Sequence, residues 1–246
     1  MVKYCFLLLI LFFSQGVDAD DQLPTSLSIA APEIPPLVYY NEKQELVGTL
    51  VEKLNIFSRK TGIKVSIEVM TWARALAQVK HNEHDALMPT IKTPERENYL
   101  TFPKIALINF KSSVLIQRET EQSPYDSLES LITGKIIAKA RSMSLGEQMD
   151  LLIRQTRPEL VEVNSIEAAI QMLDIGRVDF VATDKGIALS VMNKLTLKSN
   201  FHFIEVGAES SDSYLAFSQK FSTKYDVEKL MKIILATNDS EIFTPH

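Results

Sequence analysis

Strand-like and helix-like segments alternate along this 246-residue chain, and this alternation restricts the fold more than any other feature. Within residues 46–62 the apolar side chains recur at helical spacing, and Gly62 is placed to end the helix. Within residues 63–69 they alternate with polar ones, as in a strand. A helix at 72–79 and a strand at 85–88 are predicted next. This order predicts a parallel sheet with crossover helices, and so an α/β fold.

The second half of the chain repeats this plan. We expect, in order, a helix begun by Ser123 and Pro124 and ended by Gly134, a strand at 135–140, a helix capped by Ser144, a strand at 161–163, a helix at 166–173 and a strand at 178–182. Ser144 and Glu147 have the spacing of a capping box. Two similar halves indicate two lobes of one architecture.

A local sequence echo relates the two halves, because residues 79–90 can be aligned with 173–184. In each copy a helix stops at a residue that tolerates left-handed geometry, Asn82 or Gly176, and an aspartate leads into a short apolar strand. The two strands end at Thr90 and Asp184. Ligands of open parallel sheets collect outside the carboxyl ends of the strands, so Thr90 and Asp184 are candidate cleft residues on opposing lobes.

The N-terminus has the pattern of a cleaved export signal. Lys3 precedes an apolar run over residues 4–13, and Val17-Asp18-Ala19 has small residues at the positions that a signal peptidase reads. The run has about half the length that a bilayer span needs. Cleavage after Ala19 removes Cys5, the only cysteine, so the mature chain relies on hydrophobic burial and not on disulfides. We expect a periplasmic protein whose mature length suits two modest domains.

Composition excludes several partner classes. Acidic residues number 31 and basic ones 26, which gives no basic footprint for nucleic acid. No cysteine and histidine cluster has metal-ligand spacing, so neither a metal nor another cofactor is expected.

Several short segments, taken in order, resemble the family 3 extracellular solute-binding proteins, the periplasmic binding components of amino-acid ABC importers and their relatives. They are the stretch from Pro35-Pro36-Leu37 to Gly48, the Trp72 segment, Asp85-Ala86, Thr93-Pro94-Glu95-Arg96, Gly176-Arg177-Val178-Asp179 and Asp184. The resemblance covers about residues 26–218. It implies a two-lobed periplasmic binding protein fold of type II-like topology, in which each lobe is a mainly parallel sheet flanked by helices. Two crossing hinge strands join the lobes, and a solute is trapped between them by hinge closure.

The resemblance also implies domain boundaries. The signal occupies residues 1–19, lobe 1 begins with 20–112, lobe 2 covers 113–205, and residues 206–246 return to lobe 1. The crossings are expected near residues 111–115 and 204–207.

Two charged residues carry the roles that the resemblance implies for an amino-acid ligand. Arg96 matches the arginine that grips a ligand carboxylate, a task for which the planar guanidinium fork is suited. Its alternative role is a solvated arginine in the first turn of a helix capped by Thr93. Asp184 matches the aspartate that pairs with an α-ammonium group, but it is also well placed to cap a helix, and both roles are compatible.

Other candidate contacts lie around the predicted cleft. Trp72 follows a strand end and is either a ligand platform or a core residue, while Arg74 completes a Trp-x-Arg pattern and is otherwise solvated. Tyr39 follows the proline turn, where family aromatics flank the ligand, and Glu33 lies beside that turn as either a cation contact or a solvated loop residue. Ser142 lies in the loop whose counterpart donates hydrogen bonds to the ligand carboxylate.

Three departures from the family pattern concern the identity of the solute. Leu37 stands where an aromatic residue is usual, Ile91 where serine or threonine is common, and no acidic residue follows Gly48 within residues 49–51. These changes leave fold and carboxylate capture in place but weaken the assignment to α-amino acids.

Three functions compete at this point. The first is a monomeric binder that hands a small polar, amino-acid-like or carboxylate-bearing solute to an inner-membrane ABC permease. The second is a sensory binder that reports to a membrane receptor. The third is a dehydratase-like enzyme on the same fold, but Lys185 follows Asp184 and no second acid is adjacent, so we expect no catalysis.

Overall fold

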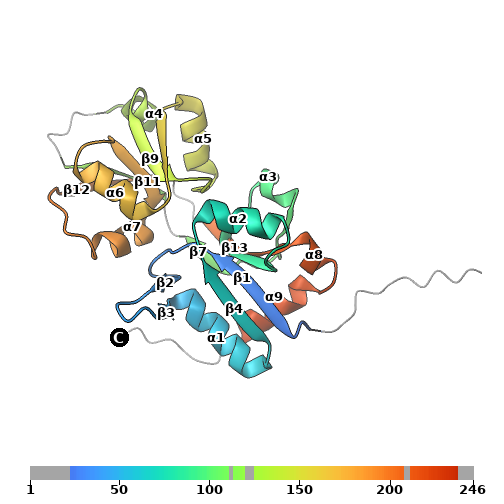
Figure 1. Cartoon of the computed structure of the whole chain (residues 1–246). Helices are drawn as coiled ribbons and strands as arrows, with labels where there is room; N and C mark the ends of the chain where they lie inside the picture. Colours follow the sequence, from blue (N-terminus) through green and yellow to red (C-terminus); the bar gives the residue numbers. More distant parts are fainter. Residues whose placement is uncertain (1–22, 111–112, 120–124, 208–210, 238–246) are drawn as a thin grey trace, which may run out of the picture.

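The chain folds into two α/β lobes, described by a computed structural model over residues 23–110, 113–119, 125–207 and 211–237. We call residues 23–110 with 211–237 lobe 1, and 113–119 with 125–206 lobe 2 (Figure 1). The predicted signal segment, residues 1–19, lies outside the described residues. No helix in the described ranges is long and apolar enough to cross a membrane.

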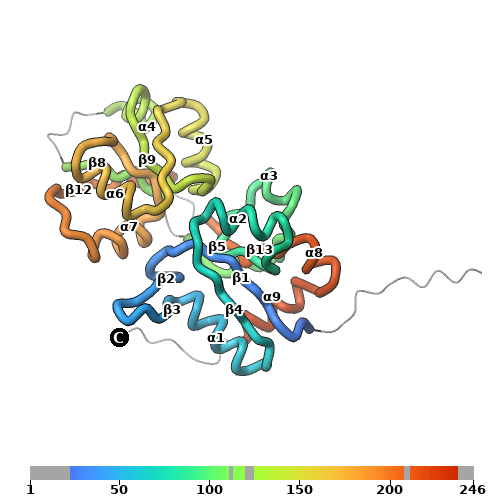
Figure 2. Tube along the Cα trace, viewed as in Figure 1, coloured from blue at the N-terminus to red at the C-terminus, as the bar shows by residue number. Residues whose placement is uncertain are grey.

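Lobe 1 is built on a six-stranded sheet in the order β4-β1-β5-β13-β6, with β7 paired to β13, and a small β2-β3 ladder beside it. Its elements are β1 (Ser26–Ala31), β2 (Tyr39–Tyr40), β3 (Leu46–Val47), α1 (Thr49–Thr61), β4 (Lys64–Val69), α2 (Trp72–Lys80), β5 (Ala86–Ile91), α3 (Pro94–Glu97), β6 (Leu100–Thr101), β7 (Ile108–Phe110), β13 (Ser211–Ser218), α8 (Gln219–Ser222) and α9 (Val227–Ala236). Figure 2 shows the red C-terminal segment with α8 and α9 beside the blue and green part of this lobe. The last part of the described chain therefore completes the first lobe.

Lobe 2 is built on a five-stranded sheet in the order β10-β9-β11-β8-β12. Its elements are β8 (Ser113–Arg118), α4 (Leu128–Ile132), β9 (Ile136–Ala140), α5 (Glu147–Thr156), β10 (Glu159–Val163), α6 (Ile166–Asp174), β11 (Phe180–Asp184), α7 (Lys185–Met192) and β12 (Phe201–Val206). The parallel trio β10-β9-β11 has the same order as β4-β1-β5 of lobe 1. The echo seen in the sequence is thus an echo of topology, and the α/β two-lobed fold is confirmed.

Both sheets are covered on both faces, as their alternating side chains require. In lobe 1, Leu27 and Ile29 of β1 face a core shared with α1 and α9, whereas Ala30 faces a second cluster with Trp72 and Ala75 of α2. In lobe 2, α4 and α5 cover one face and α6 and α7 the other. These paired layers hold the carboxyl ends of the parallel strands at fixed positions beside the other lobe.

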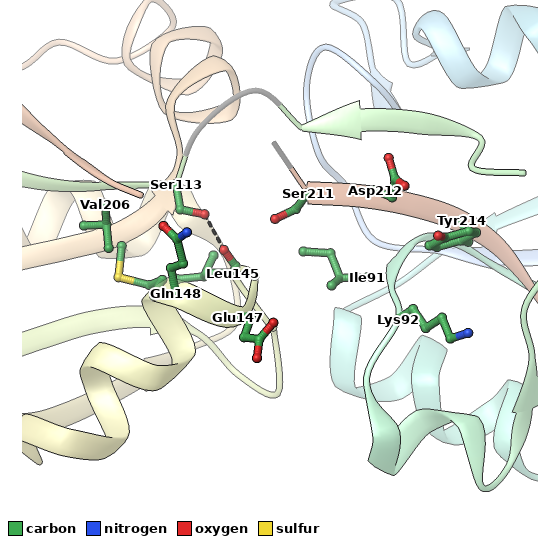
Figure 3. A pocket seen from close by; sticks show the side chains of 12 residues that line it. Ile91, Lys92, Ser113, Leu145, Glu147, Gln148, Val206, Ser211, Asp212 and Tyr214 are labelled. Carbon is green, nitrogen blue, oxygen red and sulfur yellow. Dashed lines mark hydrogen bonds between the residues drawn. The ribbon is translucent and has the colours of Figure 1, made fainter. Parts of the chain in front are cut away.

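The chain passes between the lobes twice, and the strands on either side of each crossing are antiparallel members of the two sheets. β7 ends at Phe110 and β8 begins at Ser113, while β12 ends at Val206 and β13 begins at Ser211. β8 pairs antiparallel with β11 and β12, and β13 with β5, β6 and β7, so both sheets are mixed. Beside these crossings lies a pocket of about 250 Å³, where the Ser113 hydroxyl donates to the Leu145 carbonyl (Figure 3).

Two predicted helix starts differ from the structure. The first helix of lobe 2 begins at Leu128 with Ser127 as its N-cap, not at Ser123 and Pro124, which lie outside the described residues. The next begins at Glu147 with Gly146 as its N-cap, and the predicted cap Ser144 instead donates its hydroxyl to the Asp150 carboxylate at 2.5 Å.

Candidate functional site

The candidate site lies where the carboxyl end of β9 in lobe 2 meets α2 and α3 of lobe 1. β4 leads into Trp72 at the start of α2, β5 leads through Ile91 to Arg96 on α3, and β9 leads into the loop that carries Ser142. Strand ends converge here in the way that open α/β sheets position ligand-contacting residues.

Arg96 is the central residue of this site, and the residue is buried, with 5% of its surface exposed. α3 places it, because the Thr93 side chain accepts from the Arg96 backbone N–H at the helix N-terminus. Its Nη1 donates to the Ile91 carbonyl at 2.7 Å and its Nη2 to the Ser142 carbonyl at 2.8 Å. Burial lowers the pKa of the Arg96 guanidinium from its ordinary value, and nearby acidic groups oppose the shift.

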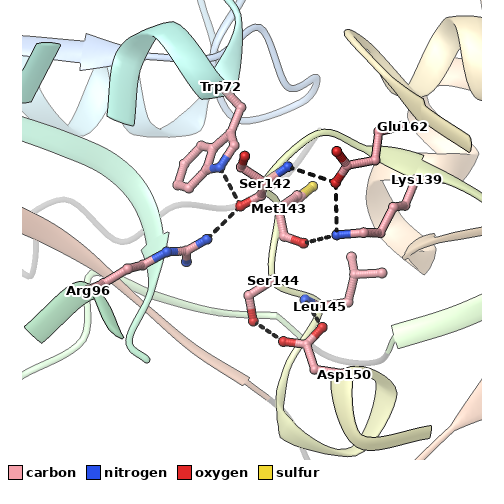
Figure 4. A network of polar contacts seen from close by, with 9 residues as sticks. All are labelled: Trp72, Arg96, Lys139, Ser142, Met143, Ser144, Leu145, Asp150 and Glu162. Carbon is pink, nitrogen blue, oxygen red and sulfur yellow. Dashed lines mark hydrogen bonds and ion pairs between the residues drawn. The ribbon is translucent and has the colours of Figure 1, made fainter. Parts of the chain in front are cut away.

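Trp72, on the neighbouring helix α2, contacts the same Ser142 carbonyl as Arg96. The indole Nε1 donates to the Ser142 carbonyl at 2.8 Å, and the Arg96 guanidinium carbon lies 5.0 Å from the centre of the indole ring (Figure 4). Cation–π attraction favours that geometry. Trp72 is 7% exposed and packs in an apolar cluster with Ala30 and Leu87, so it is both a core residue and a hydrogen-bond donor of the site.

The pocket beside Arg96 has a volume of about 480 Å³ and carries charges of both signs. From lobe 1 it is lined by Leu76, Thr93, Pro94, Glu95, Arg96 and Tyr99, and from lobe 2 by Lys139, Ser142, Met143, Ser144, Asp150, Ile153, Arg154 and Leu160. The size is typical of small-molecule sites, and the mixed charge suits a zwitterion. In the described ranges, no group of three His, Cys, Asp or Glu side chains is placed to hold a metal ion.

The structure brings together Trp72, Arg96 and Ser142 from the predicted set, although Ser142 takes part through its backbone carbonyl and its side chain is exposed. Thr90 is fully buried, and its hydroxyl donates to the Leu87 carbonyl at 3.3 Å. Arg74 is exposed on α2 and does not line the Arg96 pocket. Solute contact by any of these residues stays a prediction.

Three further predicted residues lie along other parts of the interface between the lobes. Asp184 caps α7 by accepting from the Ile187 N–H at 3.1 Å, and it lines a pocket of about 680 Å³ that does not include Arg96. The Tyr39 ring faces Lys194 Nζ of lobe 2 at 4.1 Å. Glu33 is exposed, accepts from the Tyr40 N–H at 3.4 Å and lines a pocket of about 320 Å³.

Met143 and Lys139 are site residues that the sequence reasoning missed. Met143 packs against the apolar clusters of both lobes, and Lys139 Nζ donates to the Met143 carbonyl at 3.1 Å. The available signal for Met143 was an apolar side chain between two serines in the loop after a predicted strand. Such a residue needs a partner outside its own loop.

Comparison with known proteins identifies the family of this chain. The family model described as bacterial extracellular solute-binding proteins, family 3, matches residues 28–164. The chain belongs to this family. The L-cystine-binding protein TcyA of Bacillus subtilis is 22% identical over 202 residues, covering 80% of this chain and 71% of the relative.

Solved structures agree with the family 3 fold. The arginine-bound form of truncated ArgBP from T. maritima has a TM-score of 0.68 at 18% identity, covering 88% of this chain and 96% of that one. The substrate binding protein of an amino acid ABC transporter has a TM-score of 0.67 at 15% identity, covering 86% and 91%. The predicted family is therefore confirmed, and this chain is an extracellular solute-binding protein of family 3.

Proposed function

We propose that this family 3 protein binds an amino acid or a similar small carboxylate-bearing zwitterion between its lobes, with the carboxylate on Arg96, and delivers it to an ABC importer. One observation carries the proposal: Arg96, a residue with 5% exposure, makes its side-chain hydrogen bonds to backbone carbonyls and, in the described part of the chain, forms no salt bridge with a carboxylate. A buried cation whose hydrogen bonds go only to neutral carbonyls favours an anionic ligand.

The relatives support the amino-acid class. TcyA is named for L-cystine, and the ArgBP structure holds arginine. Both are amino acids, whose α-carboxylate suits Arg96 and whose ammonium group suits the Glu95 and Asp150 carboxylates that line the same pocket. Asp184 is a second candidate partner for the ammonium group.

A thermal-shift screen against amino acids, dicarboxylates and polyamines tests the binding class, because a solute that binds only the native state raises its melting temperature. The Arg96→Ala variant is expected to lose at least about thirtyfold in affinity for any carboxylate hit, since it removes one side of a buried charge pair. Arg59→Ala, which removes an exposed arginine at the end of α1, is the matched control and should keep the shift.

Two results contradict the proposal. One is a carboxylate solute that shifts Arg96→Ala as strongly as the native chain. The other is a native chain, cooperatively folded, that no amino acid or carboxylate in the panel stabilises.

The proposal includes location, assembly and chemistry. We expect a monomer in the periplasm, freed from its signal after Ala19, that binds its solute without converting it. Cell fractionation with N-terminal sequencing checks the first point, and light scattering on a sizing column checks the second. Incubation with prephenate or arogenate should leave both compounds unchanged, and turnover would contradict the assignment as a binding protein.

A further inference from the structure

The site beside Arg96 contains an acceptor that belongs to the protein itself. The Ser142 carbonyl accepts from Trp72 Nε1 and from Arg96 Nη2, both at 2.8 Å, although these donors lie 70 and 46 positions away in the chain. Both donors come from lobe 1 and the acceptor from lobe 2. Figure 4 shows the indole and the guanidinium pointing at this one oxygen. The convergence of a cation and a neutral N–H on one oxygen is the arrangement that a bound carboxylate oxygen would use.

Lobe 2 holds the loop in the conformation that presents this oxygen. The Ser142 N–H donates to the Glu162 carboxylate at 3.3 Å, and the Arg141 N–H donates to the Val163 carbonyl at 2.9 Å. Lys139 fixes the next carbonyl, that of Met143, at 3.1 Å. Ser142 itself has φ 56, a left-handed conformation that costs a non-glycine residue free energy. The surrounding contacts therefore maintain a backbone geometry that serine alone does not favour.

Apolar contacts also join the two lobes in this arrangement. The Met143 side chain packs against the cluster of Trp72 and α2 as well as against its own lobe. Elsewhere, Ile34 of lobe 1 packs with Ile166 and Ile187 of lobe 2. The two lobes are thus in contact while the Ser142 carbonyl, a group of the chain itself, occupies the acceptor position.

We propose that the Ser142 carbonyl is an internal competitor for the carboxylate of the solute: it latches the lobes closed on Trp72 Nε1 and Arg96 Nη2, and a carboxylate must displace it. A carboxylate oxygen forms stronger, charge-assisted bonds with the same donors, so it can replace a neutral carbonyl. The displacement depends on the proposed function, whereas the latch does not.

Substitutions at Ser142 change the latch through the backbone alone. Within the described residues the exposed Ser142 side chain makes no hydrogen bond, so replacing it leaves no partner unpaired. Ser142→Gly accepts the left-handed conformation freely and is expected to strengthen the latch. Ser142→Val is β-branched, disfavours that conformation and is expected to weaken it.

The first measurement uses no solute. Small-angle scattering should give a larger radius of gyration for Ser142→Val than for the native chain, and acrylamide should quench the single tryptophan, Trp72, more strongly. Ser142→Gly should match the native chain in both. Trp72→Phe, which keeps a ring and removes the N–H, is a second variant that should open in scattering. If Ser142→Val and Trp72→Phe are folded and as compact as the native chain, the latch is wrong.

The second measurement uses L-cystine and L-arginine as probes. Apparent affinity falls by the fraction of molecules that are latched, so Ser142→Val should bind a probe about fivefold more tightly and Ser142→Gly about fivefold more weakly than the native chain. Affinities that move in the same direction, or not at all, contradict the competition. Failure of the native chain to bind either probe or any carboxylate of the screening panel contradicts the proposed function instead, and the latch is then judged by scattering alone.

Discussion

At the residue scale, Asp85 and Asp179 show how the two lobes reuse one local device. Asp85 accepts from the Ser28 N–H at 2.8 Å, and its own N–H donates to the Ser28 carbonyl. Asp179 makes the same pair of bonds with Ile136, also with 2.8 Å to the carboxylate. Each aspartate thereby ties the entry of one central strand to the first residues of its neighbour. The sequence echo predicted an aspartate before each strand, but it did not predict this bonding.

The two aspartates differ in burial, and this difference predicts their contribution to stability. Asp85 is half-buried and also accepts from the Ser28 hydroxyl at 2.8 Å, whereas Asp179 is exposed. Asp85→Ala is therefore expected to cost about 2 kcal/mol of unfolding free energy, because it leaves half-buried donors unpaired, and Asp179→Ala about 1 kcal/mol. Urea unfolding followed by circular dichroism measures both. Equal costs, or a larger cost at Asp179, would contradict the argument from burial.

At the element scale, local signals explain where most helices begin and end. α1 ends at Gly62 with φ 76, and the helices of the echo stop beside Asn82 with φ 61 and Gly176 with φ 74, as their residue types predict. The prediction for α5 was wrong, because Ser144 has the spacing of a cap but bonds instead to Asp150 within α5. When a side chain has two possible hydrogen-bond partners, the packing of the fold determines which partner it bonds. The spacing of residues in the sequence does not reveal that choice.

Gly48 is the point where α1 meets the turn before β2, and glycine is required there for two reasons. Its φ is 131, and a Cβ would lie 2.2 Å from the Leu37 carbonyl oxygen. Gly48→Ala is expected to cost more than about 2 kcal/mol, since the clash with backbone adds to the conformational cost. Gly134→Ala is the matched control, with φ 72 and open space, and should cost about 1 kcal/mol. Melting temperatures that fall equally in the two variants would contradict the steric argument.

At the scale of the whole molecule, the arrangement of two lobes follows from the alternating pattern and the family segments. Both sheets place their parallel trio in one order, and the crossings fall between β7 and β8 and between β12 and β13. The family segments also pointed to Trp72, Arg96 and Ser142 as cleft residues. No spacing rule predicts that donors 70 and 46 positions away meet one backbone oxygen, because that contact depends on how the two lobes pack against each other. Composition and motifs report on side chains, whereas the group that the two donors share is a backbone carbonyl, that of Ser142.

The central claim is that a carboxylate solute binds at the donors of Trp72 and Arg96. The chain contains one tryptophan, so its nitrogen-proton correlation spectrum contains one indole signal, and that signal reports the acceptor of Trp72 Nε1. Titration with the amino acid that gives the largest thermal shift should move this signal saturably as the acceptor changes from the Ser142 carbonyl to the carboxylate. A solute that stabilises the protein to saturation and leaves the Trp72 indole signal in place would show that the binding site lies elsewhere.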